Sequence, residues 1–293
     1  MHEIRKEIKQ FLSDENQKIP LIAFRYSRDN INEKTDVKFS RPMRAEIYVH
    51  LSGDGTFFIG DHMYKLTYGD ILIYNKDEVH FSTIESNTVW ERFVIFFMPE
   101  HFTFIRSMNE ELLSFFYQRE NYEYNLISLP EQQRKRLIDL CFQIIGYDGE
   151  SEFDIQLNLF TNFLQILKMV NQGYVRPAVE QPKTKTPKII KDVIEYINRH
   201  FHEAITLEQM AKHFSISKSH LSSYFRKYIG VSPYEYLLNV RLEQAKRLLT
   251  HGGSITDVCY ACGFSDYSHF IQFFKKRTGM TPHKYQKTHT QPL

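Results

Sequence analysis

Two cysteines three positions apart, Cys259 and Cys262, are the first residues of this sequence that could do chemistry. Such pairs occur in redox motifs and in structural zinc sites, which need four ligands. The sequence has no second cysteine pair, and the nearby His251 and His269 lack the spacing of a zinc finger. The only other cysteine is Cys141, so no disulfide framework is expected. We therefore expect Cys259 and Cys262, one helical turn apart, to pack in a core.

Hydrogen-bonding and cationic side chains recur in two related segments near the carboxyl end. "SKSHLSSYFRKYIGVSPYEYL" begins at Ser217 and "SDYSHFIQFFKKRTGMTPHKYQ" begins at Ser265. They align at a shift of 49 residues, which matches Leu221 with Phe270, Phe225 with Phe274, His220 with His269, Gly230 with Gly279, Pro233 with Pro282 and Tyr236 with Tyr285. Repeats that share core, turn and cap positions indicate two copies of one supersecondary unit.

Each copy is preceded by a short helix that carries its own cap. Thr206 opens "TLEQMAKHF" with a Thr-x-x-Gln capping box, and Ser254 opens "SITDVCYACGF" with Ser-x-x-Asp. A short helix, a tight turn and a longer helix form a helix-turn-helix, which can place its second helix in a DNA major groove. Between the copies, the segment from Pro233 to Leu249 predicts one helix about 25 Å long. This connector could place two recognition helices in successive major-groove segments, about 34 Å apart.

The charge of the chain is unevenly distributed. From Lys183 to the end there are 17 Lys and Arg against 8 Asp and Glu, a net charge of +9. The remaining residues hold 20 basic against 27 acidic side chains, a net charge of −7. A basic half beside an acidic half is typical of a protein in which one part binds a polyanion and the other does not. Charge alone is equally consistent with a basic surface that is simply solvated.

The acidic half begins with a β pattern. From about Pro20 to Phe97, runs such as "EIYVHL", "GTFFIG" and "VWERFVIFFM" are rich in Ile, Val, Tyr and Phe, with Gly-Asp turns between them. Many short, evenly spaced strands predict a small antiparallel barrel, whose interior can hold one small ligand.

Helices are expected after the barrel. In "FDIQLNLFTNFLQILKMVNQ" the apolar residues recur at steps of three and four, and Leu159 and Ile166 widen the apolar face beyond one stripe. A helix that is apolar on more than one side needs two partners. Docking on the barrel alone is one explanation, and we favour a second, in which the rest of the face forms a homodimer interface.

These features together carry a family resemblance. The tandem units, the connector "VRLEQAKRLL" and above all "GFSDYSHFIQFFKKRTGMTPHKYQ" resemble the AraC/XylS family of bacterial transcription regulators over about residues 189–286. The stretch "SGDGTFFIGDHMYKLTYGDILIYNKDEVH" is similar, much less specifically, to the cupin-like sensor domain common in that family. The resemblance implies DNA binding and effector sensing, and it does not identify the effector.

DNA-contacting residues are expected on the faces opposite the core pairs, which are Leu221 with Phe225 and Phe270 with Phe274. The resemblance places base-reading residues near Ser219, Ser222 and Ser223, and Gln272 can pair bidentately with adenine. The cationic residues later in each helix, such as Arg226 and Lys275, could bind DNA phosphates. The full expected set is Lys218, Ser219, Ser222, Ser223, Arg226, Lys227, Tyr267, Ser268, Gln272, Lys275 and Lys276. Asp266 is expected to cap its helix.

An effector site is expected in the barrel. Cupins often bind a metal through two His, a Glu and a third His; here Glu46 and His80 match two of these places, with His50 four residues after Glu46, but the early His-x-His pair is absent. We therefore expect no metal and no other cofactor. A polar pocket for an anionic or sugar-like molecule is expected instead, lined by Arg25, Arg44, Glu46, Tyr48, His80 and Trp90.

The predicted fold is multidomain α+β. It comprises a cupin-like sensing barrel (residues 1–100), a helical dimerisation segment (101–173), a linker (174–187) rich in proline, and an all-α tandem helix-turn-helix DNA-binding domain (188–293). The chain lacks a secretory signal and an apolar run of about 18 residues, so a cytoplasmic location without membrane contact is expected.

The predicted function is a non-enzymatic, effector-responsive regulator, and an activator in particular. The expected partners are double-stranded promoter DNA, a small-molecule effector, a second copy of the chain and RNA polymerase. Two alternatives remain open at this point: a constitutive DNA-binding regulator whose barrel only dimerises, and a cupin metalloenzyme fused to a DNA-binding domain.

Overall fold

A computed structural model describes residues 5–13, 20–32, 38–40, 44–60, 62–76, 78, 80–102, 110–117, 124–146, 151–175, 184–185 and 187–289. The chain divides into two compact units. The first consists of Met1–Asp36 and Pro42–Thr184, and the second of Val37–Arg41 and Lys185–Leu293. We call them the N-terminal and the C-terminal unit.

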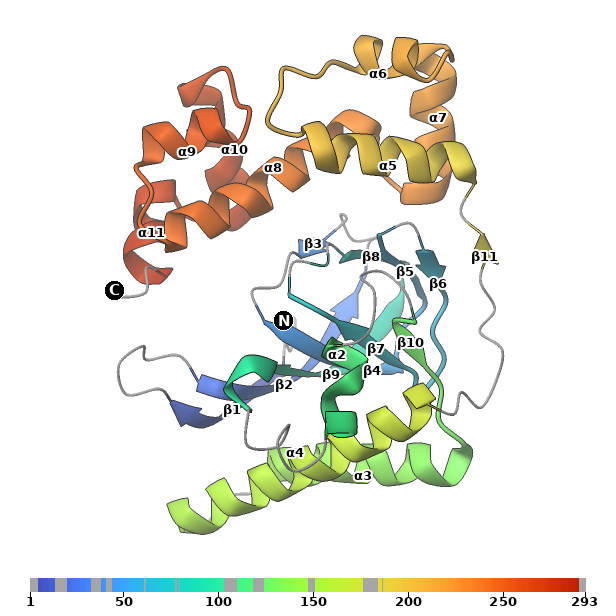
Figure 1. Cartoon of the computed structure of the whole chain (residues 1–293), viewed down its shortest axis with the longest axis vertical. Coiled ribbons are helices and arrows are strands. Elements are labelled where there is room, and N and C mark those ends of the chain that lie inside the picture. The colour runs from blue at the N-terminus through green and yellow to red at the C-terminus, as the bar shows by residue number, and fades with distance from the viewer. Residues whose placement is uncertain are drawn as a thin grey trace. The chain divides into compact units, whose positions relative to one another are not determined.

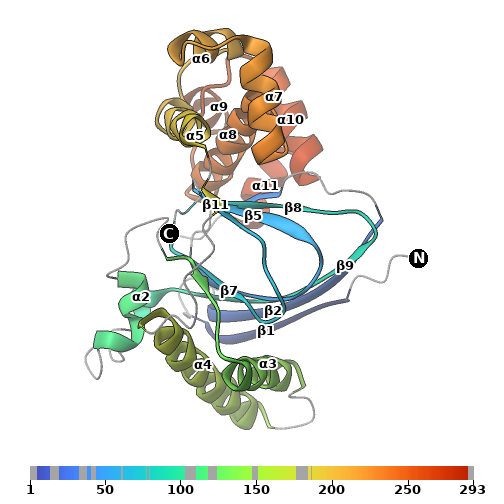
Figure 2. The ribbon, with the colours of Figure 1, turned by 90° about the vertical axis from the view of Figure 1, so that its right-hand side faces the viewer.

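The N-terminal unit is built around a six-stranded sheet with the strand order β1-β2-β9-β4-β7-β10. A second sheet contains the antiparallel neighbours β6, β5 and β8, and the two sheets face each other in Figure 2. The strands are β1 (Arg5–Ser13), β2 (Pro20–Ile31), β3 (Lys38–Ser40), β4 (Ala45–Ser52), β5 (Gly55–Ile59), β6 (His62–Tyr64), β7 (Ile71–Tyr74), β8 (His80–Ile84), β9 (Thr88–Phe97), β10 (Leu126–Ile127) and β11 (Thr184–Lys185).

The period-two alternation of the sequence assigns the two faces of the six-stranded sheet. On β4, Ala45, Ile47 and Val49 belong to a core cluster shared with helices, whereas Tyr48 belongs to a cluster shared with the second sheet. On β9, Phe93 likewise joins the helical cluster. We call the face that carries Tyr48 the inner face, because it is turned toward the second sheet.

Helices cover the outer face. The helices of this unit are the short η1 (Pro99–His101), η2 (Glu110–Leu113) and α2 (Ser114–Tyr117), followed by α3 (Glu131–Gly146) and α4 (Glu152–Val175). Phe163 of α4 is fully buried and its ring packs against Phe24 and Phe97 of the sheet. Figure 2 shows α3 and α4 on the side of this sheet that faces away from the second sheet.

The C-terminal unit is helical apart from its short strands. Its helices are α5 (Lys188–His200), α6 (Leu207–His213), α7 (Lys218–Ile229), α8 (Pro233–Thr250), α9 (Ile255–Ala261), α10 (Tyr267–Thr278) and α11 (Pro282–His289). Figure 1 shows α8 running between the pair α6 and α7 and the pair α9 and α10. The multidomain α+β fold that the sequence predicts is therefore confirmed.

Candidate nucleic-acid interface and effector site

The helices α7 and α10 begin and end alike. The Ser217 hydroxyl accepts a hydrogen bond from the His220 amide (3.2 Å), and the Asp266 carboxylate accepts one from the His269 amide (2.8 Å). Asp266 therefore caps its helix, as expected. Both helices end at a glycine in the left-handed region, Gly230 and Gly279, where a side chain would be strained.

Each recognition helix turns one face to the core. Leu221 and Phe225 of α7 are buried, and so are Phe270 and Phe274 of α10, the equivalent pair after the shift of 49 residues. The predicted DNA contacts lie on the remaining faces. Ser222 is half-buried, and the others are exposed: Lys218, Ser219, Ser223, Arg226, Lys227, Tyr267, Ser268, Gln272, Lys275 and Lys276.

Caps also fix the helices that precede them. Thr206 and Gln209 form the predicted capping box at the start of α6, with both reciprocal hydrogen bonds. At the start of α9 the Ser254 hydroxyl accepts from the Asp257 amide (3.1 Å) and donates to the Asp257 carboxylate (2.6 Å). In the view of Figure 2, α7 and α10 run in the same general direction. Two equivalent, basic helices are thus presented by one unit.

The inner face of the N-terminal unit carries buried polar side chains. Glu46, Tyr48 and His50 alternate along β4 and are all buried. In the antiparallel register Glu46 is opposite Tyr74 of β7, and Tyr48 is opposite Val94 of β9, so these side chains share one face.

Glu46 also meets the second sheet. Its Oε2 lies 3.8 Å from Nε2 of His80 on β8, whose ring stacks on that of Tyr74 with centroids 3.7 Å apart. Burial raises the pKa of Glu46 to about 8, against the lowering effect of Arg25 and Arg44. Burial also lowers the pKa of His80 to about 4. Both shifts favour the uncharged form of the group at neutral pH, so they favour a neutral acid beside a neutral imidazole over an ion pair.

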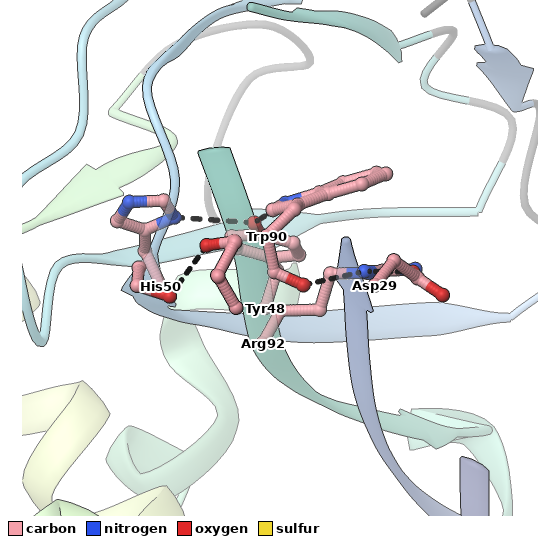
Figure 3. Close-up of polar contacts among 7 residues, drawn as sticks. Asp29, Tyr48, His50, Trp90 and Arg92 are labelled. Atoms are coloured by element: carbon pink, nitrogen blue, oxygen red, sulfur yellow. Dashed lines mark hydrogen bonds and ion pairs between the residues drawn. The ribbon is translucent and has the colours of Figure 1, made fainter. Parts of the chain in front are cut away.

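A chain of polar contacts surrounds Trp90 (Figure 3). The indole Nε1 donates to the Tyr48 hydroxyl (3.0 Å), which lies 3.3 Å from Nδ1 of His50. The guanidinium carbon of Arg92 lies 3.6 Å from the centre of the Trp90 ring, and Arg92 pairs with Asp29 at 2.6 Å. Burial raises the pKa of Tyr48 far above its usual range, so its hydroxyl keeps its proton. This arrangement holds an aromatic plane and several neutral hydrogen-bonding groups in fixed positions.

Both units match known families. Residues 30–161 match a family model described as the AraC-like ligand binding domain, and residues 210–288 match one described as a helix-turn-helix domain. A curated relative, the HTH-type transcriptional activator RhaS of Escherichia coli O139:H28 (strain E24377A / ETEC), is 24% identical over 238 residues, which cover 81% of this chain and 83% of the relative. The chain belongs to the AraC family.

This AraC-family protein is a DNA-binding transcription regulator with a ligand-binding domain, and not an enzyme, in agreement with its relatives. Among solved structures, the C-terminal domain of the response regulator yesN from Fusobacterium nucleatum is 31% identical and covers 33% of this chain and 95% of that chain, with a TM-score of 0.32. A protein from Listeria innocua is 34% identical and covers 35% of this chain and 98% of that chain, with a TM-score of 0.34.

The six predicted effector-contacting residues of this AraC-family protein differ in burial. Glu46, Tyr48 and Trp90 are buried on the inner face, and His80 reaches Glu46 from the second sheet. Arg44, just before β4, is half-buried and burial lowers its pKa, although Glu46 opposes that shift. Arg25 is exposed, with its guanidinium 4.9 Å from the centre of the Phe96 ring.

Sequence reasoning missed several residues of this cluster. Arg92 contacts Trp90 and Tyr74 contacts His80, whereas Asp29 joins the cluster through Arg92. His50, which its spacing from Glu46 suggests only as a metal ligand, contacts Tyr48. Arg92 could have been found, because it follows Trp90 by two positions on one strand and therefore shares its face. Asp29 could not, because its pairing with Arg92 depends on the placement of β2 beside β9.

The C-x-x-C pair is part of a core. Cys259 and Cys262 are both fully buried, in a cluster with Phe264, Phe270 and Phe274, and burial raises the pKa of both thiols, that of Cys262 to about 12. The core-packing expectation is confirmed. Within the described ranges, no group of three or more His, Cys, Asp or Glu side chains is placed to hold a metal ion. In the same part of the chain, no helix combines the length and hydropathy that crossing a bilayer requires.

Proposed function

We propose that this protein is a transcription activator that binds promoter DNA through α7 and α10 together and changes its DNA binding when a neutral, polyhydroxylated effector occupies the inner face. The observation that carries the DNA part is the equivalence of two exposed, basic helix faces within one unit. Activation is supported by the name of the curated relative, a transcriptional activator. Activation also requires contact with RNA polymerase, and the protein acts in the cytoplasm, where promoter DNA is found.

The proposed domain limits are the ones that the sequence predicts. Residues 1–100 sense the effector, 101–173 dimerise, 174–187 link and 188–293 bind DNA. The expected side chains divide by role. Gln272 and the serines of α7 contact base edges, whereas Arg226, Lys275 and their neighbours bind phosphates.

The chemistry of the inner face favours a neutral effector over an anion. At neutral pH the carboxyl of Glu46 keeps its proton and His80 is uncharged. The half-buried cation Arg92 is already paired with Asp29. Apart from Arg44 and Arg25, whose charges act on Glu46, what remains is a set of neutral donors and acceptors beside the indole of Trp90, which suits hydroxyl groups on a compact ring. Each sugar hydroxyl both donates and accepts, as the Tyr48 hydroxyl does.

A homodimer through α4 completes the proposal. Phe153 and Leu157 lie one turn apart on α4 and are 73% and 51% exposed, whereas Leu159, Phe163 and Ile166 of the same helix are buried against the sheet. The wide apolar face that the sequence predicts is thus half covered within the chain. A second copy of α4 would cover the exposed stripe.

The effector part is tested by thermal unfolding of the full chain with neutral monosaccharides and, in parallel, with their phosphates and acids. A neutral sugar should raise the melting temperature of the protein. Tyr48→Phe should lower the affinity for that sugar by about fivefold, because one hydrogen bond is lost. Tyr68→Phe, at an exposed tyrosine, is the matched control and should leave binding unchanged. Stabilisation by acids or phosphates only, or by nothing in the panel, would contradict the proposed effector class.

The DNA part is tested by selecting fragments of genomic DNA that the full chain binds. The expected result is a small set of fragments upstream of genes, bound with strong salt dependence. Equal binding of all fragments would contradict it.

A further inference from the structure

A buried guanidinium lies where both helix-turn-helix units meet the connector α8. Arg241 is only 5% exposed. Its Nε donates to the carbonyl oxygen of Phe201 (2.8 Å) and its Nη2 donates to the carbonyl oxygen of Glu203 (2.7 Å). Phe201 is the C-cap residue that follows α5, so its carbonyl is one that a helix end leaves without an amide donor, whereas the Glu203 carbonyl also accepts from the Ile205 amide (2.8 Å). Arg241 therefore anchors α8 to the loop that leads into the first helix-turn-helix unit.

The turn of the second unit packs against the same loop. Gly263 has φ +83°, and a Cβ added to it would lie 2.6 Å from the Phe201 carbonyl oxygen and 3.0 Å from Nη2 of Arg241. The next residue, Phe264, is buried with its ring centre 5.8 Å from the Arg241 guanidinium carbon. Only glycine allows this close approach of two backbones.

The second unit is joined to α8 by a pair of glycines and packs on α8 through Leu242, Ala245 and Leu249. Between α8 and α9 stand Gly252 and Gly253, and Gly252 has φ +82° with nothing within 4 Å of an added Cβ. Glycine has the widest choice of backbone conformations, and at this joint Gly253 is held by a hydrogen bond from Nε2 of Gln286 to its carbonyl oxygen (2.7 Å). The contact of Gly263 with Phe201 and Arg241 bridges that joint from the other side, and it links the turn of the second unit to the entry of the first.

We propose that the junction of Arg241, Gly263 and Phe201 fixes the position of α10 relative to α7, and so sets the separation of the two DNA half-sites that the chain accepts. Arg241 is a positioning residue in this scheme, remote from the exposed faces of both recognition helices. Lysine cannot replace it, because one ammonium lacks the planar fork that reaches two carbonyls at once. The DNA consequence rests on the proposed function, whereas the structural consequence does not.

The structural consequence is measured without DNA by the distance between spin labels on α7 and α10. The labels are attached at Ser223→Cys and Gln272→Cys of the full chain, diluted with unlabelled protein so that only distances within one chain contribute. The native cysteines Cys141, Cys259 and Cys262 are buried and therefore protected from labelling. We expect one narrow distance distribution for the parent and a broadened or shifted one for Gly263→Ala and Arg241→Lys.

Gly252→Ala is the matched control, because it carries the same positive-φ strain without a contact to push apart. Equal distributions for Gly263→Ala and Gly252→Ala, or a broad distribution for the parent, would overturn the proposal. If Arg241→Lys does not fold, the comparison of the two glycine variants decides the question alone.

The DNA consequence is measured on a selected bipartite site with one base pair inserted between its halves. For the parent and for Gly252→Ala the insertion should lower affinity by about tenfold, and for Gly263→Ala by clearly less. Affinity for a single half-site should be the same for all three proteins, which separates positioning from a general loss of stability. If the inserted base pair lowers the affinity of Gly263→Ala as much as that of the parent, the inference is refuted. If the parent binds no bipartite site, the proposed function is refuted, and the spin-label distances alone then test the role of the junction.

Discussion

Replacing Phe153 and Leu157 with glutamate should convert the proposed dimer into a monomer. The two side chains are 73% and 51% exposed. Complete burial of such a side chain contributes about 1.5–3 kcal/mol, so covering these exposed fractions contributes about 2–4 kcal/mol per chain and about 4–7 kcal/mol per dimer. Each 1.4 kcal/mol is a tenfold change, so the dimer dissociation constant should rise by about 10³- to 10⁵-fold.

The assay is sedimentation equilibrium of the full chain over a concentration series. Because both positions are exposed in the single chain, the double variant should fold, and its helix content and melting temperature report this directly. Lys135→Glu, an exposed charge change on α3, is the control and should dimerise like the parent. A double variant that dimerises as tightly as the parent, or a parent that is monomeric at tens of micromolar, would refute the assignment of this stripe to a dimer interface.

Two further predictions concern the DNA and effector sites. In a sequence-selection assay, Gln272→Ala should reduce the preference for one base at one position of the selected site by about 1–3 kcal/mol. Lys275→Ala should instead lower the affinity for all sequences, and in a salt titration it should reduce the slope of log affinity against log salt by about one unit. Similar behaviour of both variants would contradict this division of roles. Because burial raises the pKa of Glu46 from about 4.5 to about 8, the folded state holds a proton that the unfolded state releases, and this stabilisation is lost as the pH rises through that window. In urea unfolding between pH 5 and pH 8, Glu46→Gln should therefore lose less stability than the parent, by a few kcal/mol as an order of magnitude; parallel curves would show that Glu46 is ionised throughout.

The repeat explains why the C-terminal unit was predictable in detail. Its caps, core pairs and glycine ends are local features, and a second copy at a shift of 49 residues shows which of them are structural. The N-terminal strands were predictable where alternation is strong, as on β4. The strand β1 (Arg5–Ser13) was not, because "RKEIKQFLS" is charged and becomes a strand through its long pairing with β2.

The candidate sites were predictable only in part. Glu46 and Tyr48 share a face because of strand periodicity, which a sequence reveals. The meeting of Glu46 with His80 depends on how two sheets face each other, and the burial of Arg241 depends on the packing of three helices. No local pattern distinguishes Arg241 from the exposed cations of the same unit. Long-range packing, rather than residue type, decides these roles.

The measurement that tests the central claim most directly is a hydroxyl-radical footprint of the full chain on a selected genomic site. If α7 and α10 bind together, each bound chain should protect two backbone patches on one face of the duplex, about one helical turn apart, and Gln272→Ala should disturb only one of them. A single protected patch per chain, or two patches on opposite faces of the DNA, would contradict the account.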